Sequence, residues 1–332
     1  MTARVACIGT GFMAGKHLAA LASFDDVDVV AVADPVVDRA RAVADDLGAR
    51  AYEDGLELLA TEELDAVWMC VPPFAHGALE RAAIARDLPF FVEKPLAHDL
   101  ETATTIAEEL SDRGLLAAVG YHWRYLDVVE RVAEHCRELP PHLVTGYWLD
   151  STPPVAWWSQ RSSSGGQVIE QTTHLFDLAR LLVGEVERVW ADELVVAGTD
   201  PGPDAPVPLV ATAQLRFRSG CLGAVSSART LPARHRVGLH LVGDGYAVEL
   251  AESAIVDHEL RITDGSGTTV ERSDQDPVAA EDRAFLDAVL GRGDDVRAPY
   301  AEAIRSHALA WAADVSAREG RPVDVTPVGV HA

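Results

Sequence analysis

The segment Val5–Ala14 reads Val-Ala-Cys-Ile-Gly-Thr-Gly-Phe-Met-Ala, and it decides the fold of the first third of the chain. Its four leading apolar residues predict a buried strand, and the glycine run opens a stretch of helical period. Gly9 permits a tight turn, Gly11 lets a pyrophosphate approach the backbone, and Ala14 allows close packing of helix on strand. Because a helix N-terminus offers amide donors to anions, the segment predicts a dinucleotide-binding turn.

Around this turn, short runs rich in Val, Ala and Ile alternate with longer segments of helical period as far as Gly120. This alternation is typical of a parallel sheet with crossover helices. We therefore expect an α/β fold in which residues 1–121 form a doubly wound Rossmann domain. The expected strands are 4–8, 28–33, 49–52, 65–71, 89–93 and 116–120, and the expected helices are 12–23, 36–47, 55–61, 75–87 and 99–113.

Residues 122–332 have a different rhythm, and we expect them to form an α+β domain for substrate binding and oligomerisation. A helix to about Glu138 and a second helix over 167–183 precede strand-like runs joined by turn signals such as Gly243-Asp244-Gly245. Such turns suit antiparallel hairpins, so an open, mainly antiparallel sheet is expected. The expected strands are 186–196, 208–218, 221–229, 236–242, 245–251 and 258–263, and two final helices over 278–291 and 299–318 should pack back on the body.

The charge balance excludes two classes of partner. The chain has 332 residues, with 28 Lys and Arg against 52 Asp and Glu, which gives a formal net charge of −24. This charge repels a phosphate backbone, so nucleic acid and anionic membranes are poor partners. No window approaches the roughly 20 uninterrupted apolar residues of a membrane span, and we expect a cytoplasmic protein.

The four cysteines do not predict a disulfide or a metal site. Cys7, Cys70, Cys136 and Cys221 are scattered along the chain, and the first two lie in apolar strand-like runs. A thiol in such a run behaves as a small apolar group. The sequence also contains no Cys and His cluster with metal-ligand spacing, so we expect no bound metal.

Asp34 indicates which dinucleotide binds. It ends the second expected strand, where a carboxylate accepts hydrogen bonds from the adenosine ribose hydroxyls and repels a 2′-phosphate. We therefore expect NAD as the cofactor and NADP to be less favoured. Arg39 follows in the next helix, where we expect it to pair with Asp38 or solvent.

Lys94 follows the fifth expected strand within Glu93-Lys94-Pro95, at the sheet edge where doubly wound folds bind ligands. Other motifs accompany it, namely Val71-Pro72-Pro73-Phe74-Ala75-His76, Gly120-Tyr121-His122-Trp123-Arg124, and Gly165-Gly166 followed by Glu170 and His174. With these motifs the chain resembles the glucose-fructose oxidoreductase / inositol dehydrogenase / MocA family over nearly its whole length.

The resemblance implies an NAD(P)-dependent enzyme that moves hydride between nicotinamide and a secondary alcohol carbon, commonly of a sugar or cyclitol. It implies that Lys94 contacts the nicotinamide ribose and the reacting oxygen, and that His174 is the general acid/base. It also implies a homodimer or homotetramer. The residues that it places around the cofactor are Phe12, Met13, Pro72, His76, Glu93 and His122. From the residues alone, His76 could equally be a surface residue at the start of a helix.

Glu170 and His174 stand four residues apart on the expected helix 167–183, so they should share a face. The carboxylate could then orient the imidazole or bind a substrate hydroxyl, although such a pair is also common on a solvated helix face. A histidine titrates near neutrality, which suits proton transfer in both directions of an alcohol oxidation. Lys94 would stabilise the alkoxide-like oxygen. The family usually has Asp at the position of Glu170, whose side chain is one methylene longer.

Four further residues are candidate substrate contacts. Trp158 could stack on the C–H face of a sugar, and Arg161 could hold a hydroxyl or a carboxylate. Alternatively, the tryptophan only anchors its loop to the core. Tyr121 and Arg124 border the expected site, but Arg124 could instead lock the domain junction.

The leading functional hypothesis is a dehydrogenase that acts on a sugar, a sugar derivative or a cyclitol. One alternative on the same fold is an NAD-dependent glycosidase that oxidises C3 transiently and regenerates its coenzyme. A second alternative is a regulator that binds NAD and a sugar without turnover. The presence of both Lys94 and His174 argues against the regulator.

Overall fold

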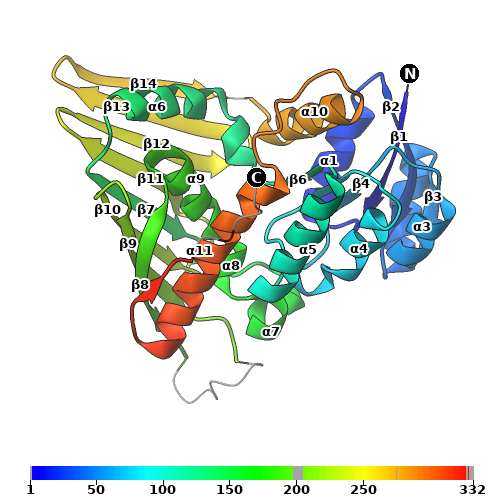
Figure 1. The fold of residues 1–332 in the computed structure, drawn as a ribbon, viewed down its shortest axis with the longest axis horizontal. Coiled ribbons are helices and arrows are strands. Elements are labelled where there is room, and N and C mark those ends of the chain that lie inside the picture. The colour runs from blue at the N-terminus through cyan, green and yellow to red at the C-terminus, as the bar shows by residue number, and fades with distance from the viewer. Residues whose placement is uncertain (1, 197–204, 274, 327, 329–332) are drawn as a thin grey trace.

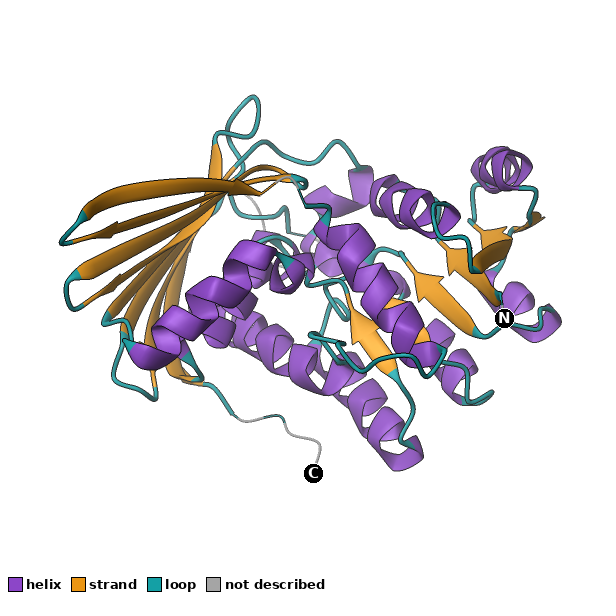
Figure 2. Cartoon of the chain, turned by 90° about the horizontal axis from the view of Figure 1, so that it is seen from above, coloured by secondary structure: helices purple, strands orange, loops and turns teal. Residues whose placement is uncertain are grey.

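The computed structural model describes residues 2–196, 205–273, 275–326 and 328, and it contains two sheets with helices between and around them (Figure 1). Viewed from above, the larger sheet stands at one end of the molecule and the smaller one at the other (Figure 2). The two sheets follow one another in the chain and are the centres of two layered units, although helices that come after the larger sheet also pack on the smaller one.

In the described part of the chain, the smaller sheet has six strands and is entirely parallel. Its strands are β1 (Ala3–Ile8), β2 (Val27–Ala33), β3 (Arg50–Tyr52), β4 (Ala66–Met69), β5 (Phe90–Val92) and β6 (Ala117–Val119). They lie in the order β3-β2-β1-β4-β5-β6, with the chain reversing its direction of travel across the sheet between β3 and β4. The expected Rossmann sheet is confirmed, and its switch point beside β1 is where such folds bind ligands.

The crossover helices of this sheet agree with the expected ranges except in one place. They are α1 (Phe12–Ala22), α2 (Val37–Leu47), α3 (Gly55–Thr61), α4 (Ala78–Ile84) and α5 (Leu100–Arg113), with a 3-10 turn η1 (Pro73–Ala75) before α4. The helix expected over 75–87 begins only at Ala78. Gly77 has a φ of 109°, outside the helical region, and its N–H donates to the Glu80 carboxylate as the helix cap.

The larger sheet has nine strands within the described residues and is antiparallel except at one pair. Its strands are β7 (Leu143–Leu149), β8 (Val186–Leu194), β9 (Val210–Phe217), β10 (Leu222–Ala228), β11 (Arg236–Gly243), β12 (Tyr246–Ala254), β13 (Asp257–Asp264), β14 (Gly267–Ser273) and β15 (Val323–Asp324). The order is β14-β13-β12-β11-β7-β10-β9-β8-β15, and β7 pairs with β10 in parallel. The expected open, mainly antiparallel sheet is confirmed.

Three strands of this sheet, β7, β14 and β15, were not among those expected from the sequence. Gly146 interrupts the apolar alternation of β7 because an added Cβ there would lie 3.3 Å from the side chains of Leu175 and Leu239. The sequence signal of β7 is therefore weakened by the same close packing that holds a helix against it. Strand β14 is mostly exposed and offers no apolar pattern.

The remaining helices cover one face of the larger sheet or connect the two units. They are η2 (His122–Tyr125), α6 (Asp127–Glu138), η3 (Ala156–Ser159), α7 (Arg161–Ser164), α8 (Gln167–Glu170), α9 (Thr173–Val183), α10 (Pro277–Val289) and α11 (Tyr300–Glu319). Helix α10 contacts α1, and α11 contacts both α5 and β8, so the final helices pack back on the body. Among the described helices, none is long and apolar enough to cross a bilayer.

The helix expected over 167–183 is wrong as a single element. Helix α8 ends at Glu170, and α9 begins at Thr173. The break is closed by Thr172, whose N–H donates to the carbonyl of Gln167 at 3.0 Å and whose hydroxyl donates to the same oxygen at 3.2 Å. A bond from residue i+5 back to residue i ends an α-helix, so Glu170 and His174 do not share one helix face.

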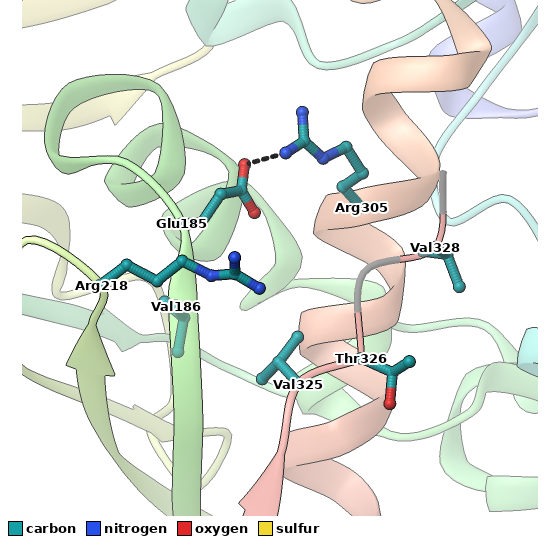
Figure 3. A pocket seen from close by; sticks show the side chains of 7 residues that line it. All are labelled: Glu185, Val186, Arg218, Arg305, Val325, Thr326 and Val328. Carbon is teal, nitrogen blue, oxygen red and sulfur yellow. Dashed lines mark ion pairs between the residues drawn. The ribbon is translucent and has the colours of Figure 1, made fainter. Parts of the chain in front are cut away.

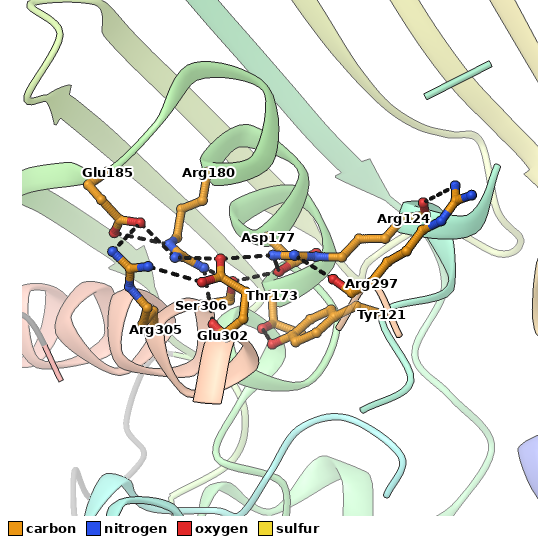
Figure 4. Close-up of polar contacts among 10 residues, drawn as sticks. All are labelled: Tyr121, Arg124, Thr173, Asp177, Arg180, Glu185, Arg297, Glu302, Arg305 and Ser306. Carbon is orange, nitrogen blue, oxygen red and sulfur yellow. Dashed lines mark hydrogen bonds and ion pairs between the residues drawn. The ribbon is translucent and has the colours of Figure 1, made fainter. Parts of the chain in front are cut away.

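A buried ion-pair network holds the junction between the two units (Figure 4). Arg124 donates to both carboxylate oxygens of Asp177 at 2.7 Å, and it also donates to the carbonyl of Arg297 at 2.9 Å. Ser306 of α11 donates to Asp177 at 2.6 Å, and Glu302 of the same helix pairs with Arg124 at 3.4 Å. This bidentate geometry fixes η2, α9 and α11 relative to one another.

Candidate active site

The turn between β1 and α1 is open where an anion would bind. A Cβ on Gly9, whose φ is 94°, would lie 2.2 Å from the carbonyl oxygen of Cys70, so this position requires glycine. Gly11 caps α1 without a side-chain hydrogen bond, and no described atom lies within 4 Å of a Cβ added there. The first amides of α1 therefore stay available for a pyrophosphate. Phe12 is 75% exposed beside the turn, and Met13 is half-buried.

Asp34 lies at the end of β2 and is already surrounded by donors. Thr10 donates its N–H and its hydroxyl to Oδ2, at 3.0 and 2.7 Å, and the N–H of Val36 donates to Oδ1 at 2.8 Å. Burial alone would raise the pKa of Asp34, but these donors lower it below its ordinary value. Of the two expected surroundings of Arg39, pairing with Asp38 is wrong, because Asp38 pairs with Arg41. The Arg39 side chain is 54% exposed to solvent, and its guanidinium donates to Asp34 at 2.8 Å.

Pro72 and His76 lie on the other side of the switch point, before and after η1. His76 is buried rather than on the surface, and its Nδ1 lies 2.5 Å from Glu80. Burial would raise the pKa of Glu80, but His76 and the backbone donors around the carboxylate lower it below its ordinary value. His76 Nε2 is buried without a partner among the described residues, so it has one hydrogen-bonding position to offer.

Glu93 turns away from solvent and belongs to a buried acidic cluster. Its carboxylate lies 3.0 Å from His17 Nε2, while Asp282 of α10 lies 2.8 Å from His17 Nδ1. Burial alone would lower the pKa of His17, but Asp282 and Glu93 raise it well above its ordinary value. A Cβ on Gly120 would lie 2.4 Å from the Glu93 carboxylate, which explains the glycine there. His17 was not singled out in the sequence, since nothing local connects it with Asp282.

Among the described residues, three members of this cluster are spaced closely enough to hold a metal ion. His17, Glu93 and Glu281 each offer an atom within 4.8 Å of the others. Both ring nitrogens of His17 already contact carboxylates, and burial raises the pKa of Glu281 well above its ordinary value. The hydrogen bonds of His17 to Glu93 and Asp282 therefore occupy its ring nitrogens, whereas both Glu281 oxygens are buried without a partner among the described residues.

Lys94 and Glu170 meet between the two units. The Lys94 ammonium donates to the Glu170 carbonyl at 2.9 Å and to its Oε1 at 3.1 Å. Their side chains are 12% and 14% exposed, so the pair is largely shielded from water. The other carboxylate oxygen, Oε2, accepts from the indole N–H of Trp158 at 2.7 Å. Both Glu170 oxygens are thus bound within the protein, and neither orients His174.

His174 lies in an aromatic cage that includes Trp123, Trp148, Tyr121 and His122. Its ring stacks on Trp123 and Trp148 at centroid distances of 6.1 and 5.7 Å, and the His122 ring crosses it at 4.9 Å. Burial, then the charges of Lys94 and His122, lower the pKa of His174 well below its ordinary value.

Glu252, on β12, is a buried carboxylate beside this cage that sequence analysis missed. It accepts from the indole N–H of Trp123 at 2.6 Å and from Arg234 at 2.5 Å, and it lies 3.7 Å from His122 Nε2. Burial would raise its pKa, but His122, His258 and Arg234 lower it well below its ordinary value. Nothing in the local sequence of β12 connects it with residues 130 positions earlier.

The four expected substrate contacts are all buried or paired. Tyr121 shares a hydrogen bond of 2.7 Å with the Thr173 hydroxyl, and Arg124 is held by the junction network, as in the alternative noted from the sequence. Trp158 is 1% exposed, which fits its anchoring alternative. Arg161 pairs with Glu193 at 2.5 Å, and its side chain is 16% exposed.

A separate hollow lies between Arg305, in the N-terminal half of α11, and the segment that follows β15 (Figure 3). Its lining residues are Glu185, Val186, Arg218, Arg305, Val325, Thr326 and Val328. None of these contributes to the Lys94 or His174 groups, and Glu185 and Arg305 neutralise one another at 2.9 Å. The hollow is therefore distinct from the candidate active site.

The open glycine turn, the donor-lined Asp34 and the Lys94 group lie along the carboxyl edge of one parallel sheet, which is the arrangement of a dinucleotide-dependent enzyme. Residues 3–121 match the model of the oxidoreductase family with an NAD-binding Rossmann fold, and residues 140–249 match the GFO/IDH/MocA C-terminal domain. The chain belongs to this family and is an NAD-binding oxidoreductase.

Three similar proteins illustrate the relationship. The chain is 31% identical over 231 residues to myo-inositol 2-dehydrogenase of Thermotoga maritima, covering 68% of each chain. It is 30% identical over 248 residues to the NAD⁺-dependent scyllo-inositol 2-dehydrogenase of Bacillus subtilis, covering 72% of this chain and 71% of the relative. The crystal structure of a putative myo-inositol dehydrogenase from Sinorhizobium meliloti 1021 superposes with a TM-score of 0.80 at 26% identity, covering 98% of this chain and all of that one.

Proposed function

We propose that the protein is an NAD-dependent dehydrogenase that acts on a secondary alcohol or ketone of a sugar, a sugar derivative or a cyclitol. The single observation that carries this proposal is the contact of Lys94, just after β5 of the Rossmann sheet, with Glu170 of the second unit, four residues before the caged His174. The inositol dehydrogenases among its relatives support the substrate class. NAD, when bound, supplies the hydride acceptor.

In this proposal Lys94 stabilises the reacting oxygen. Its ammonium has three N–H donors, and two of them point to Glu170. The third is left for the oxygen of the substrate, where negative charge develops as the proton and hydride leave. Because the site is largely shielded from water, this interaction is worth more than it would be on the surface.

His174 is the general base of the oxidation and the general acid of the reduction. Its lowered pKa keeps the imidazole neutral near pH 7, so it can accept the hydroxyl proton. Its Nδ1 is buried with no partner among the described residues. The phosphate end of the coenzyme would lie at Gly9 and Gly11, with Asp34 on the adenosine ribose.

The test is a panel of cyclitols and aldoses with NAD, followed by the absorbance of NADH. We expect net NADH formation with at least one polyol, and loss of that turnover in Lys94→Met while NADH binding by fluorescence is kept. Cleavage of a glycoside without net NADH would support the glycosidase instead. Full activity of the Lys94→Met variant would overturn the site.

Several features expected from the sequence remain part of this proposal. We infer a small polyol or sugar as the partner, a homodimer or homotetramer in solution, and a cytoplasmic location. The domain boundary between residues 121 and 122 is likewise proposed, and residues 329–332 at the end of the second domain lie outside those described. Light scattering gives the test of assembly, in which a monomeric mass contradicts the proposal.

A further inference from the structure

A series of side-chain contacts connects the larger sheet with Lys94. Arg229, just after β10, lies over the Trp158 ring at 6.0 Å from its centroid. Trp158 donates to Glu170 Oε2 at 2.7 Å, and Glu170 Oε1 accepts from Lys94 at 3.1 Å. One partly buried carboxylate therefore joins an indole of the second unit to the ammonium of the first.

The hydrogen-bonding groups of Trp158 and Arg229 already have partners within the protein. An indole has a single N–H donor, and that of Trp158 is used by Glu170. Arg229 is held behind the ring by the carbonyls of Val207 and Pro208, at 2.6 and 2.9 Å. The Trp158 ring is therefore fixed from one side and bonded on the other, with 1% of its surface exposed.

We propose that Trp158 is a positioning residue, which fixes the Glu170 carboxylate so that Glu170 in turn aims the free N–H of Lys94 at the reacting oxygen. This inference rests on the proposed function, in which Lys94 binds that oxygen. It replaces stacking on a sugar as the role of Trp158, because a ring that is almost fully buried has no face to offer. It also assigns Glu170 to Lys94 instead of to a substrate hydroxyl.

The glutamate at position 170 has the reach that this bridge needs. Its backbone carbonyl and its Oε1 both accept from Lys94, while Oε2 extends to the indole. An aspartate would be one methylene shorter and could not keep all three contacts from the same backbone position. A glutamine has one acceptor oxygen, so it could satisfy either Lys94 or Trp158 but not both.

The composition of the chain offers a direct probe of this geometry. Lys16 and Lys94 are its two lysines. Protein labelled with ¹⁵N at the lysine Nζ therefore gives two ammonium signals. Lys16 is exposed on α1, with its ammonium 5.9 Å from the centroid of the Phe12 ring, and serves as an internal reference for an exposed ammonium.

The experiment compares these signals, without substrate, in the wild-type protein and in Trp158→Phe, Glu170→Asp and Trp157→Phe. We expect the Lys94 signal to move toward that of Lys16 in the first two variants. Trp157→Phe removes an indole from the same loop that makes no described bond to Glu170, so it should leave the Lys94 signal in place. An unchanged Lys94 signal in folded Trp158→Phe and Glu170→Asp overturns the proposal. If Trp158→Phe does not fold, Trp158→Leu, which also lacks the indole N–H, takes its place.

Steady-state kinetics separate positioning from substrate contact. In Trp158→Phe, kcat should fall about tenfold with KM changed by less than about twofold, since a small misplacement of a reacting group costs rate more than binding. A raised KM with unchanged kcat would mean that Trp158 touches the substrate, and would overturn the proposal. A shifted Lys94 signal together with full activity of Lys94→Met would leave the positioning intact and remove the proposed function.

Discussion

The phosphate end and the reacting end of the proposed coenzyme site are built in different ways. The phosphate end uses one contiguous segment, from Gly9 to Asp34, and its donors are mostly main-chain amides. The reacting end brings together Lys94, His174 and Glu252 from both units of the fold. The comparison teaches that coenzyme binding is specified locally, whereas the chemistry depends on the docking of the two units.

The largest expected effect falls on the reacting end. His174→Ala should lower kcat by about 10³-fold, because general acid/base groups contribute on this scale, while NADH binding stays close to that of the wild type. Stopped-flow NADH formation and a fluorescence titration measure the two quantities. A variant that lost NADH binding as strongly as turnover would show that the two ends are not separate.

The next effect falls on the phosphate end. Gly9→Ala should weaken NADH binding by about 100-fold, since the added Cβ would lie 2.2 Å from the Cys70 carbonyl and must move the turn. Gly15→Ala is the matched control, because no described atom lies within 4 Å of a Cβ there. The comparison fails if both substitutions, measured by calorimetry, change the affinity equally.

A smaller effect concerns the choice of coenzyme. Asp34→Ala should weaken NADH binding about tenfold and narrow the difference between NADH and NADPH, because the carboxylate that repels a 2′-phosphate is gone. Asp38→Ala removes an exposed carboxylate from α2 and serves as the control. A wild-type dissociation constant lower for NADPH than for NADH would contradict the role of Asp34.

The smallest effect is that of pH on alcohol oxidation. Burial and the charges of Lys94 and His122 place the pKa of His174 well below 6.5, so the neutral base predominates above that pH. Lowering the pH from about 7.5 to 6.5 should therefore change kcat/KM by less than about twofold, with the acid limb at lower pH. An acid limb with its midpoint at or above pH 6.5 would be inconsistent with this environment.

The sequence predicts the phosphate end of the coenzyme site better than the reacting end. The Rossmann strands, the glycine turn and the position of Asp34 follow from local patterns, and the structure confirms the fold. The partners of Lys94 and the break between Glu170 and His174 do not, because they depend on Thr172, Trp158 and the packing of separate elements. A regular period over 167–183 predicts one helix, since periodicity carries no information about a side chain that ends a turn.

Long-range buried charge was the least predictable feature. His17 contacts Asp282 across 265 residues, and Glu252 reaches Trp123 across 129. Each of these residues lies in an ordinary helix or strand with no motif around it. Their partners are determined by how α10 and β12 dock, which a single sequence does not contain.

The central claim is that Lys94 and His174 form a hydride-transfer site, and isotope transfer tests it most directly. The polyol that turns over fastest is prepared with deuterium on its ring carbons and incubated with the enzyme and NAD. The account predicts that one deuterium per turnover appears on C4 of the nicotinamide. Deuterium that returns to the product or exchanges into water, with none retained on the nicotinamide, would contradict it.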